Sequence, residues 1–553
     1  MSKKTLIIII VCIVGLCTLT GCAEILLLYR SAIQTPVPAQ ATQAPLDTET
    51  SASLPVEGVG TLRLLGGLPP TFDPAMAQDS ASALYIVHIF SGLVSLNSEL
   101  KVVPDLAQSW DSSPDGKTYT FHLNPAATFQ DGRAITSADI VYSMERACSP
   151  ETASPVASSY LEDIVGVAEF AAGQVPNISG LDAPDDNTLV ITIDAPKAYF
   201  LAKLTYPAAF VVDRQQIESQ GSDWLRQPNG SGPFVLKSIA TDKIVLERNE
   251  RYYGQKPALA QVEFTMGGGT PMTMYENDQI DIVGVPPSEI ERVLDPSNPL
   301  STELHQASEL SVQYLALTTT RPPFDDVAVR QAFTMAIDRE KIADLVLKGT
   351  ASAAKGILPP TMPGFDPTLE GLAYDPAKAR ELLASSSYGA PGAMPEVVLT
   401  VSGTSGHMDG ETRAIVYLLE TNLGISITVE QVDWSDFLND MNGEVYQIYS
   451  SGWIADYPDP QNFLDIQFHS KSQQNHMGYS NPQVDQLLEQ ARTASSSEER
   501  YRLYHQAERL IVNDAAWIPL THGVEYALVK PYVHGYLSTS SIYPWLKDIS
   551  IVR

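Results

Sequence analysis

The chain has 553 residues, which is too many for one hydrophobic core, so we expect about two to four domains. Hydrophobic residues make up 44% of it and charged residues 18%, the composition of a globular protein rather than of a disordered one. The formal net charge of −30 would repel phosphate backbones, so no nucleic-acid partner is expected.

The N-terminus has the pattern of an export signal. Two lysines near the start precede an apolar run, Leu6–Leu19, that closes on the sequence LTGC. This sequence is similar to the bacterial lipobox, so we expect residues 1–21 to be a lipoprotein signal peptide and Cys22 to carry the lipid. The alternative is an uncleaved membrane anchor, because residues 5–29 are long enough to span a bilayer. Both interpretations place the rest of the chain at the extracytoplasmic face of the cell membrane.

Residues 22–58 are rich in Pro, Ala and Thr and have no apolar period, which predicts an extended, lipid-anchored linker. Signal cleavage would remove Cys12 and Cys17, so Cys148 would have no partner for an intramolecular disulfide. We expect Cys148 to be a small buried side chain rather than a reactive thiol.

From residue 61 onward the chain has the pattern of a mixed α/β protein. An Asp or Asn followed by proline predicts helices that start after Asp375 and Asn481. Apolar residues at helical spacing predict one helix over 325–348, stopped by Gly349. The order strand, helix, strand over 396–432 predicts a parallel βαβ unit. Short strands are predicted at 61–65, 118–123, 188–193, 243–248, 396–401 and 425–432.

Catalytic motifs are missing from the sequence. The sequence DGKT at residues 115–118 lacks the first glycine of a phosphate-binding loop and is more typical of a hairpin turn. The chain contains neither a G-x-S-x-G nucleophile elbow nor an H-E-x-x-H zinc motif. His469 and His476 are the nearest pair of candidate metal ligands, and no third ligand accompanies them. We therefore expect a protein that is not an enzyme and holds no metal and no cofactor.

One short stretch, SSGWIADYPDP at residues 450–460, is unusual for a water-soluble protein. Trp453 and Tyr457 flank the acid Asp456, and two prolines prevent a helix from running through. A stiff, aromatic-lined segment that offers one carboxylate is suited to a cationic ligand. The alternative is a packed corner, in which Asp456 caps backbone amides and the aromatic rings are buried.

Several stretches resemble the extracytoplasmic solute-binding proteins of family 5, the group that includes the oligopeptide- and dipeptide-binding lipoproteins of peptide ABC transporters. The most diagnostic similarity covers residues 105–146, and the other similar stretches follow in the family's order between residues 61 and 553. Those other stretches include residues 68–94, 322–340, 452–460 and 480–488.

The resemblance implies an α/β, bilobal fold of the periplasmic-binding-protein kind, type II and cluster C-like, with an extra small inserted domain. Such a protein traps its ligand at the interface of the two lobes by closing at a hinge. The parts it implies are residues 59–98, 185–290 and 520–553 for a discontinuous lobe I, residues 99–184 for the inserted domain II, and residues 291–519 for lobe II.

The resemblance also implies where the ligand binds. In peptide-binding relatives the aspartate of the GW-x-x-D motif pairs with the α-ammonium of the peptide, and here that residue is Asp456. The same motif makes Gly452, Trp453 and Tyr457 ligand-binding candidates, and Trp434 is a more distant candidate for the wall of a side-chain pocket.

Three stretches depart from the family's pattern. Residues 124–127, with the sequence NPAA, stand where the diagnostic segment of the family usually has a basic residue and a glycine. Val156 stands where the most similar oligopeptide binders have a tyrosine that lines the ligand site. Residues 449–451 lack the basic residue that often meets the carboxylate of a peptide.

The resemblance implies a monomeric substrate-binding lipoprotein that captures oligo- or dipeptides outside the cytoplasmic membrane. Its expected partners are the peptide, the transmembrane subunits of an ABC permease, and the membrane through the lipid anchor. The alternative keeps the fold but changes the cargo to a metal chelate, an oligosaccharide or a signalling peptide.

Overall fold

The computed structural model describes residues 60–537 and 545–553, which belong to one compact unit. The predicted signal peptide, Cys22 and the predicted linker lie outside the described residues. None of the helices in the described ranges has both the length and the apolar composition that crossing a bilayer requires.

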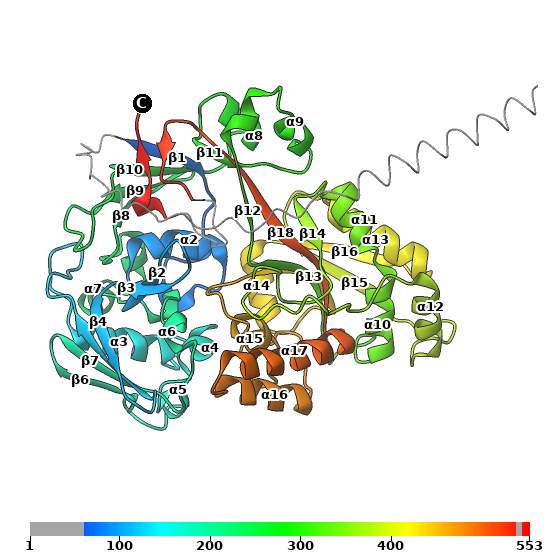
Figure 1. Cartoon of the computed structure of the whole chain (residues 1–553), viewed down its shortest axis with the longest axis horizontal. Coiled ribbons are helices and arrows are strands. Elements are labelled where there is room, and N and C mark those ends of the chain that lie inside the picture. The colour runs from blue at the N-terminus through cyan, green and yellow to red at the C-terminus, as the bar shows by residue number, and fades with distance from the viewer. Residues whose placement is uncertain (1–59, 538–544) are drawn as a thin grey trace, which may run out of the picture. The chain divides into compact units, whose positions relative to one another are not determined.

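The first sheet has the strand order β1-β10-β9-β8, and β1 runs parallel to β10 (Figure 1). Alternate residues of β1 and β10 are buried, as expected for strands with one covered face. Helix α2 supplies Tyr85 and Ile89 to the core of this sheet, and Asp79 caps α2 by accepting the N–H of Ser82 at 3.0 Å. The bounds are β1 Thr61–Leu65, α2 Ser80–Ile89, β8 Phe234–Ile239, β9 Lys243–Arg248 and β10 Gln261–Thr265.

The second sheet is antiparallel and has the order β4-β5-β7-β6. The sequence DGKT lies in the turn between β4 and β5, where Gly116 has a φ of 68°, so the expected hairpin turn is confirmed. Cys148 is a free, buried cysteine in the core beside this sheet, also as expected. The bounds are β4 Ala107–Ser112, β5 Thr118–Leu123, α3 Ser137–Cys148, α4 Ala157–Leu161, α5 Val167–Ala171, β6 Leu181–Asp185 and β7 Thr188–Thr192.

The third sheet has the order β11-β18-β13-β17-β15-β16, with β12 and β14 also paired to β18. Strands β15 and β16 are parallel and α13 connects them, so the predicted βαβ unit is confirmed. Helices α12 and α16 begin after Asp375 and Asn481, whose side chains cap them as predicted. The bounds are β11 Ile282–Gly284, β12 Leu304–Ser308, β13 Ser311–Leu317, β14 Ala351–Ala353, α12 Pro376–Ser385, β15 Val397–Ser402, α13 Gly410–Leu423, β16 Ile427–Val432, β17 Ile448–Ile454, α16 Pro482–Arg492 and β18 Trp517–Val529.

The single helix predicted over 325–348 is wrong. Helix α10 (Val327–Ala336) ends before Ile337, which is extended, and Asp338 then caps a new start by accepting the N–H of Lys341. A short helix, α11 (Arg339–Lys341), and a π-helical turn, η5 (Ile342–Val346), follow. The cap ends one helix and begins another, and apolar spacing alone does not reveal it.

Strand β18 connects two parts of the third sheet. Its first half pairs with β13, and its second half pairs with β12 and β11. At the change between partners, the N–H of Glu309 donates to the carbonyl of Gly523 at 3.0 Å. The segment at Glu309 and strand β18 at Gly523 therefore lie side by side at this point (Figure 1).

The remaining elements are the long helix α17, which packs in the core beside the third sheet, and several shorter helices and strands. They are η1 Pro74–Met76, β2 Val94–Leu96, β3 Val102–Pro104, α6 Phe200–Lys203, η2 Pro207–Ala209, α7 Arg214–Gln220, η3 Gly221–Arg226, α8 Pro271–Glu276, α9 Ile290–Leu294, η4 Pro299–Glu303, α14 Trp434–Asn442, η6 Gln461–Asp465, α15 Ile466–Phe468, α17 Ser497–Asp514, β19 Val533–His534, η7 Leu546–Asp548 and β20 Ser550–Ile551.

Candidate functional site

Strand β17 has one open edge. Along its whole length it pairs with β13, but its register with β15 covers only Ile448 and Tyr449. From Ser450 to Ile454, no strand in the described part of the chain pairs with that second edge. Backbone N–H and C=O groups on such an edge can pair with an added extended chain.

Asp456 follows the end of this open edge and is partly buried. One of its carboxylate oxygens, Oδ2, accepts a short hydrogen bond from the hydroxyl of Tyr160 and a second one, of 2.8 Å, from the side-chain amide of Asn462. Both donors are neutral, and no ion pair involves Asp456 within the described ranges. The carboxylate is thus positioned before any cation is present.

The side chain of Asn462 holds the loop that contains Asp456 in place. It is fully buried, and its Oδ1 accepts the backbone N–H of Asp456 and the indole N–H of Trp453, each at 3.1 Å. One side chain therefore orients both the acid and the neighbouring aromatic ring.

Tyr160 reaches Asp456 from the helix beside the second sheet. Its ring stacks on Tyr206, with centroids 3.6 Å apart and planes 4° apart, and the hydroxyl of Tyr206 donates to the carbonyl of Ala77 at 2.7 Å. Val156 is buried in the same cluster of side chains. The hydroxyl of Tyr160 is thus present near Asp456 although Val156 replaces the family's tyrosine.

The other predicted residues have different surroundings. Gly452 is exposed on β17 opposite Gln313, whose side chain would lie 2.5 Å from an added Cβ. Trp434 is partly buried, stacks on Phe437 and has its indole nitrogen 3.5 Å from Oδ1 of Asp79.

Tyr457 is 1% exposed, and its hydroxyl donates to Gln461. This is the position of a packing residue, as the packed-corner alternative expected for the aromatic rings. The two hydrogen bonds that Asp456 accepts from other residues come from side chains rather than from backbone amides.

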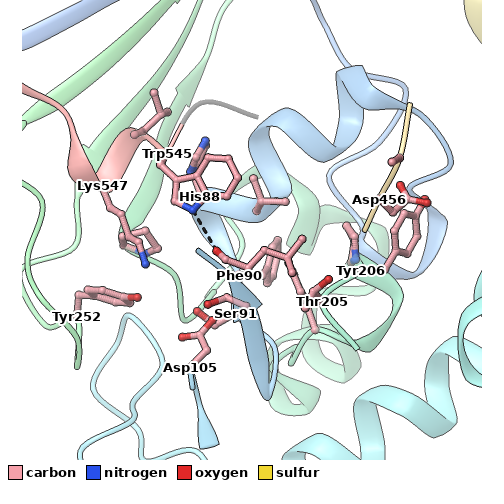
Figure 2. A pocket seen from close by; sticks show the side chains of 18 residues that line it. His88, Phe90, Ser91, Asp105, Thr205, Tyr206, Tyr252, Asp456, Trp545 and Lys547 are labelled. Atoms are coloured by element: carbon pink, nitrogen blue, oxygen red, sulfur yellow. Dashed lines mark hydrogen bonds between the residues drawn. The ribbon is translucent and has the colours of Figure 1, made fainter. Parts of the chain in front are cut away.

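A cavity begins at Asp456 and holds about 920 Å³ of empty space, including the part that opens to solvent. Figure 2 shows Asp456 and Tyr206 on one side of it and Lys547, Tyr252 and Asp105 on the other. The apolar part of the wall comes from Phe90, Leu96, Pro207, Phe210, Pro233 and Leu546.

Burial shifts the pKa values of three ionisable groups that line this cavity. It raises the pKa of Asp456 to about 6 and that of Asp105, which accepts the hydroxyl of Tyr253, also to about 6. It lowers the pKa of His88 to about 3, so His88 is neutral at ordinary pH. A ligand cation beside Asp456 would lower the pKa of that carboxyl again, because it favours the ionised form.

The sequence did not reveal several residues of this site. Tyr160, Asn462 and Lys547 come from three separate parts of the chain, and only Asn462 lies close to Asp456 in sequence. Tyr252, far from Asp456 in sequence, also lines the cavity. His469 and His476 lie beside Glu489 and Gln474, at 3.3 and 3.4 Å, and no group of three metal-ligating side chains assembles in the described ranges.

An open strand edge thus ends at a carboxylate that has no ion pair in the described part of the chain, beside a cavity, an arrangement suited to a cationic group. Comparison with protein families identifies the class of protein. Residues 101–475 match the model of the bacterial extracellular solute-binding proteins, family 5. The chain belongs to this family.

Two relatives illustrate the similarity. The chain is 31% identical to the probable deoxycholate-binding periplasmic protein YgiS of Escherichia coli, over 87% of this chain and 92% of the relative. It is also 31% identical to the periplasmic oligopeptide-binding protein OppA of Escherichia coli, over 81% of this chain and 84% of the relative.

Solved structures confirm the expected fold class. The structure of the murein tripeptide-binding protein MppA of Escherichia coli has a TM-score of 0.82 and 26% identity, covering 89% of this chain and 98% of the other. A structure described as the unliganded open form of MppA has a TM-score of 0.63 at 27% identity, over 89% of this chain and 97% of the other. The fold is the bilobal fold of periplasmic binding proteins.

Proposed function

We propose that the protein is the peptide-binding component of an ABC importer and that Asp456 binds the α-ammonium of the peptide. The observation that carries this proposal is the carboxylate of Asp456, which has only neutral donors and lies on the cavity wall. A cation that enters the cavity loses water, so a fixed anion without a counter-ion is a favourable partner. The relative OppA is an oligopeptide-binding protein, which supports the same class of ligand.

The open edge of β17 supplies the second contact in this proposal. An extended peptide would add to residues 450–454 by main-chain hydrogen bonds, which do not depend on its side chains. Gly452 is an exposed position of this edge, and Trp453 and Trp434 would form walls for side chains of the peptide.

Capture would take place by closure of the two lobes. The crossing segments at Glu309 and Gly523 are the proposed hinge, and the structure is more similar to one MppA structure than to its unliganded open form. We assign the parts as the sequence suggested with two changes: the inserted domain continues through β7, which shares its sheet, and lobe I continues through β12, which pairs with the second half of β18 and ends at the proposed hinge.

The protein would act at the outer face of the cell membrane, as a monomer held by a lipid on Cys22, and would pass its cargo to the permease without catalysis. The export pattern of the N-terminus and the periplasmic relatives support this location. Labelled fatty acid should enter the wild type but not Cys22→Ser if the anchor is correct.

Titration calorimetry with trialanine tests the role of Asp456. Asp456→Asn keeps an acceptor for Tyr160 and Asn462 but removes the charge, so affinity should fall by about thirtyfold or more. N-acetyl-trialanine has no ammonium, so it should bind the wild type weakly and lose little more in the variant.

The packed-corner alternative predicts a different result. If Asp456 served only the fold, Asp456→Asn would lower the melting temperature of the ligand-free protein and would weaken both peptides in the same proportion. Equal affinity of trialanine for wild type and variant would contradict the ammonium-binding role.

A second candidate cargo is an amphipathic acid. The largely apolar cavity wall and the name of YgiS, a probable deoxycholate-binding protein, favour it. Deoxycholate has no ammonium, so its binding should not depend on the charge of Asp456.

A further inference from the structure

Two glutamines join the proposed lobe II to the proposed inserted domain. The side-chain amide of Gln473 donates to the carbonyl of Ser154, and that of Gln474 donates to the carbonyl of Pro155, each at 2.8 Å. In the described part of the chain, neither carbonyl accepts a backbone N–H. The two glutamines are thus the partners of these carbonyls.

The amide of Gln474 is held in one orientation. Gln474 is 4% exposed, and its Oε1 lies 3.4 Å from Nε2 of His476. An amide oxygen can only accept, so the hydrogen between them belongs to His476. Burial lowers the pKa of His476 to about 4, so the ring is neutral at ordinary pH. The amide nitrogen of Gln474 therefore faces Pro155.

The two carbonyls belong to the turn that precedes α4. The hydroxyl of Ser154 accepts the N–H groups of Val156 and Ala157, at 3.2 and 2.9 Å, which holds this turn against the start of the helix. Tyr160, on the same helix, donates to the carboxylate of Asp456. One short segment thus meets the glutamines at one end and Asp456 at the other.

The same two parts share a buried apolar cluster. Val156 and Tyr160 pack with Tyr457 and Ile466, which belong to the loop and the short helix that follow β17. Figure 1 shows α4 beside α15 at this contact. Contact between protein groups therefore extends from the glutamines to the surroundings of Asp456.

We propose that Gln473 and Gln474 are a latch that stabilises the closed form of the protein without touching the cargo. This inference rests on the proposed closure of the lobes and goes beyond it, because it names residues that hold the closed form. When only the closed form binds, the apparent affinity is reduced in proportion to the closed fraction. The latch raises that fraction for every ligand alike, so it sets the strength of binding but not the choice of ligand.

Hydrogen bonds between neutral groups suit a reversible latch. When the two parts separate, water can replace each partner, so opening leaves no group without a hydrogen bond. The two glutamines and their two acceptors lie outside the cavity wall and outside the open edge of β17. Their contribution is therefore separate from the contacts proposed for a peptide.

Titration calorimetry with a double variant, Gln473→Ala and Gln474→Ala, tests the latch. One neutral hydrogen bond is worth about twofold to tenfold, so trialanine should bind the double variant about fivefold to a hundredfold more weakly. N-acetyl-trialanine should lose the same factor, because neither glutamine meets the ammonium. Asp456→Asn differs, since it should weaken trialanine far more than N-acetyl-trialanine.

Gln473→Glu decides the matter if the double variant does not fold. Gln473 is exposed, and glutamate keeps its shape but places an oxygen opposite the carbonyl of Ser154, so both peptides should again lose one common factor. Gln483→Glu is the matched control. Gln483 is exposed on α16 and outside the contact, so this variant makes the same change in charge and should bind as the wild type does.

Small-angle scattering gives a readout that needs no ligand. A latch that closes part of the ligand-free population predicts a larger radius of gyration in the double variant than in the wild type. Saturating trialanine should bring both proteins to the same smaller radius, because the ligand closes both.

Two results would overturn the latch. One is wild-type affinity for both peptides together with an unchanged ligand-free radius of gyration; if Asp456→Asn still weakens trialanine, the proposed function stands and only the latch is wrong. The other is a loss confined to trialanine, which would make the glutamines part of the ammonium site. If the wild type binds neither peptide, the proposed function is wrong, and equal ligand-free radii of wild type and double variant then overturn the latch as well.

Discussion

At the scale of single residues, the charge of Asp456 is the feature on which the proposed binding of a peptide depends. Tyr160 and Asn462 position the carboxylate, but neither supplies a positive charge, and burial raises its pKa to about 6. The ligand-free protein therefore carries an acid that is easier to protonate than a free aspartate. A cationic ligand would lower the pKa of Asp456 toward that of a free aspartate.

This pKa predicts how binding depends on pH. Only ionised Asp456 can pair with an ammonium, so the affinity for trialanine should be constant above about pH 7 and fall as the pH drops through about 6. The loss should approach tenfold per pH unit, which calorimetry in a series of buffers can measure. Asp105 titrates in the same range, so Asp456→Asn serves as the control and isolates its contribution.

The raised pKa of Asp456 also predicts an effect on stability: ionisation of this carboxyl favours the binding of a cation but opposes folding of the ligand-free protein. The folded-state pKa of Asp456 lies above its unfolded value of about 4, so ionisation of this group opposes folding. At pH 8, Asp456→Asn without ligand should melt at the same temperature as the wild type or higher. For binding, an affinity of the wild type for trialanine that did not change with pH would contradict the proposed role of ionised Asp456.

The sequence predicted Asp456 but not its surroundings. The motif of Trp453 and Asp456 is contiguous, so it can be recognised by reading along the chain. Tyr160 is 296 residues away in sequence from Asp456, and only the folded chain brings them together. Lys547 gives no local signal, because a single lysine near a C-terminus is ordinary.

At the scale of elements, local signals predicted starts better than ends. The caps at Asp375 and Asn481 and the βαβ unit over β15, α13 and β16 were predicted from spacing and composition. The interruption after α10 was missed, because the apolar period continues through Ile337 while Asp338 starts a new helix. Residues far apart in sequence set the open edge of β17, which no local pattern contains.

The loop after β17 depends on one buried amide. Asn462→Ala removes an acceptor for Trp453 and for the backbone of Asp456, and a donor to the carboxylate of Asp456. Each buried group left unpaired costs about 1–3 kcal/mol, so the melting temperature should fall, and affinity for trialanine should fall by about tenfold or more.

Thermal melting and calorimetry check this prediction. Asn439→Ala, at an exposed position of α14, is the control and should change neither quantity. If Asn462→Ala retained full affinity, the loop would not need Asn462 to orient Asp456.

At the scale of the whole molecule, the chain belongs to a family of extracellular solute-binding proteins and has their fold. The crossing of β18 beside Glu309 would allow two groups of elements to move about a short hinge. The cavity would then close over a ligand that meets the carboxylate of Asp456 and apolar side chains of the wall.

Mass spectrometry of the ligands released on denaturation of the purified protein tests this claim most directly. The account predicts short peptides with a free ammonium, and fewer of them in Asp456→Asn purified in parallel. Release of bile acids, sugars or metal chelates without peptides, in equal amounts from both proteins, would contradict it.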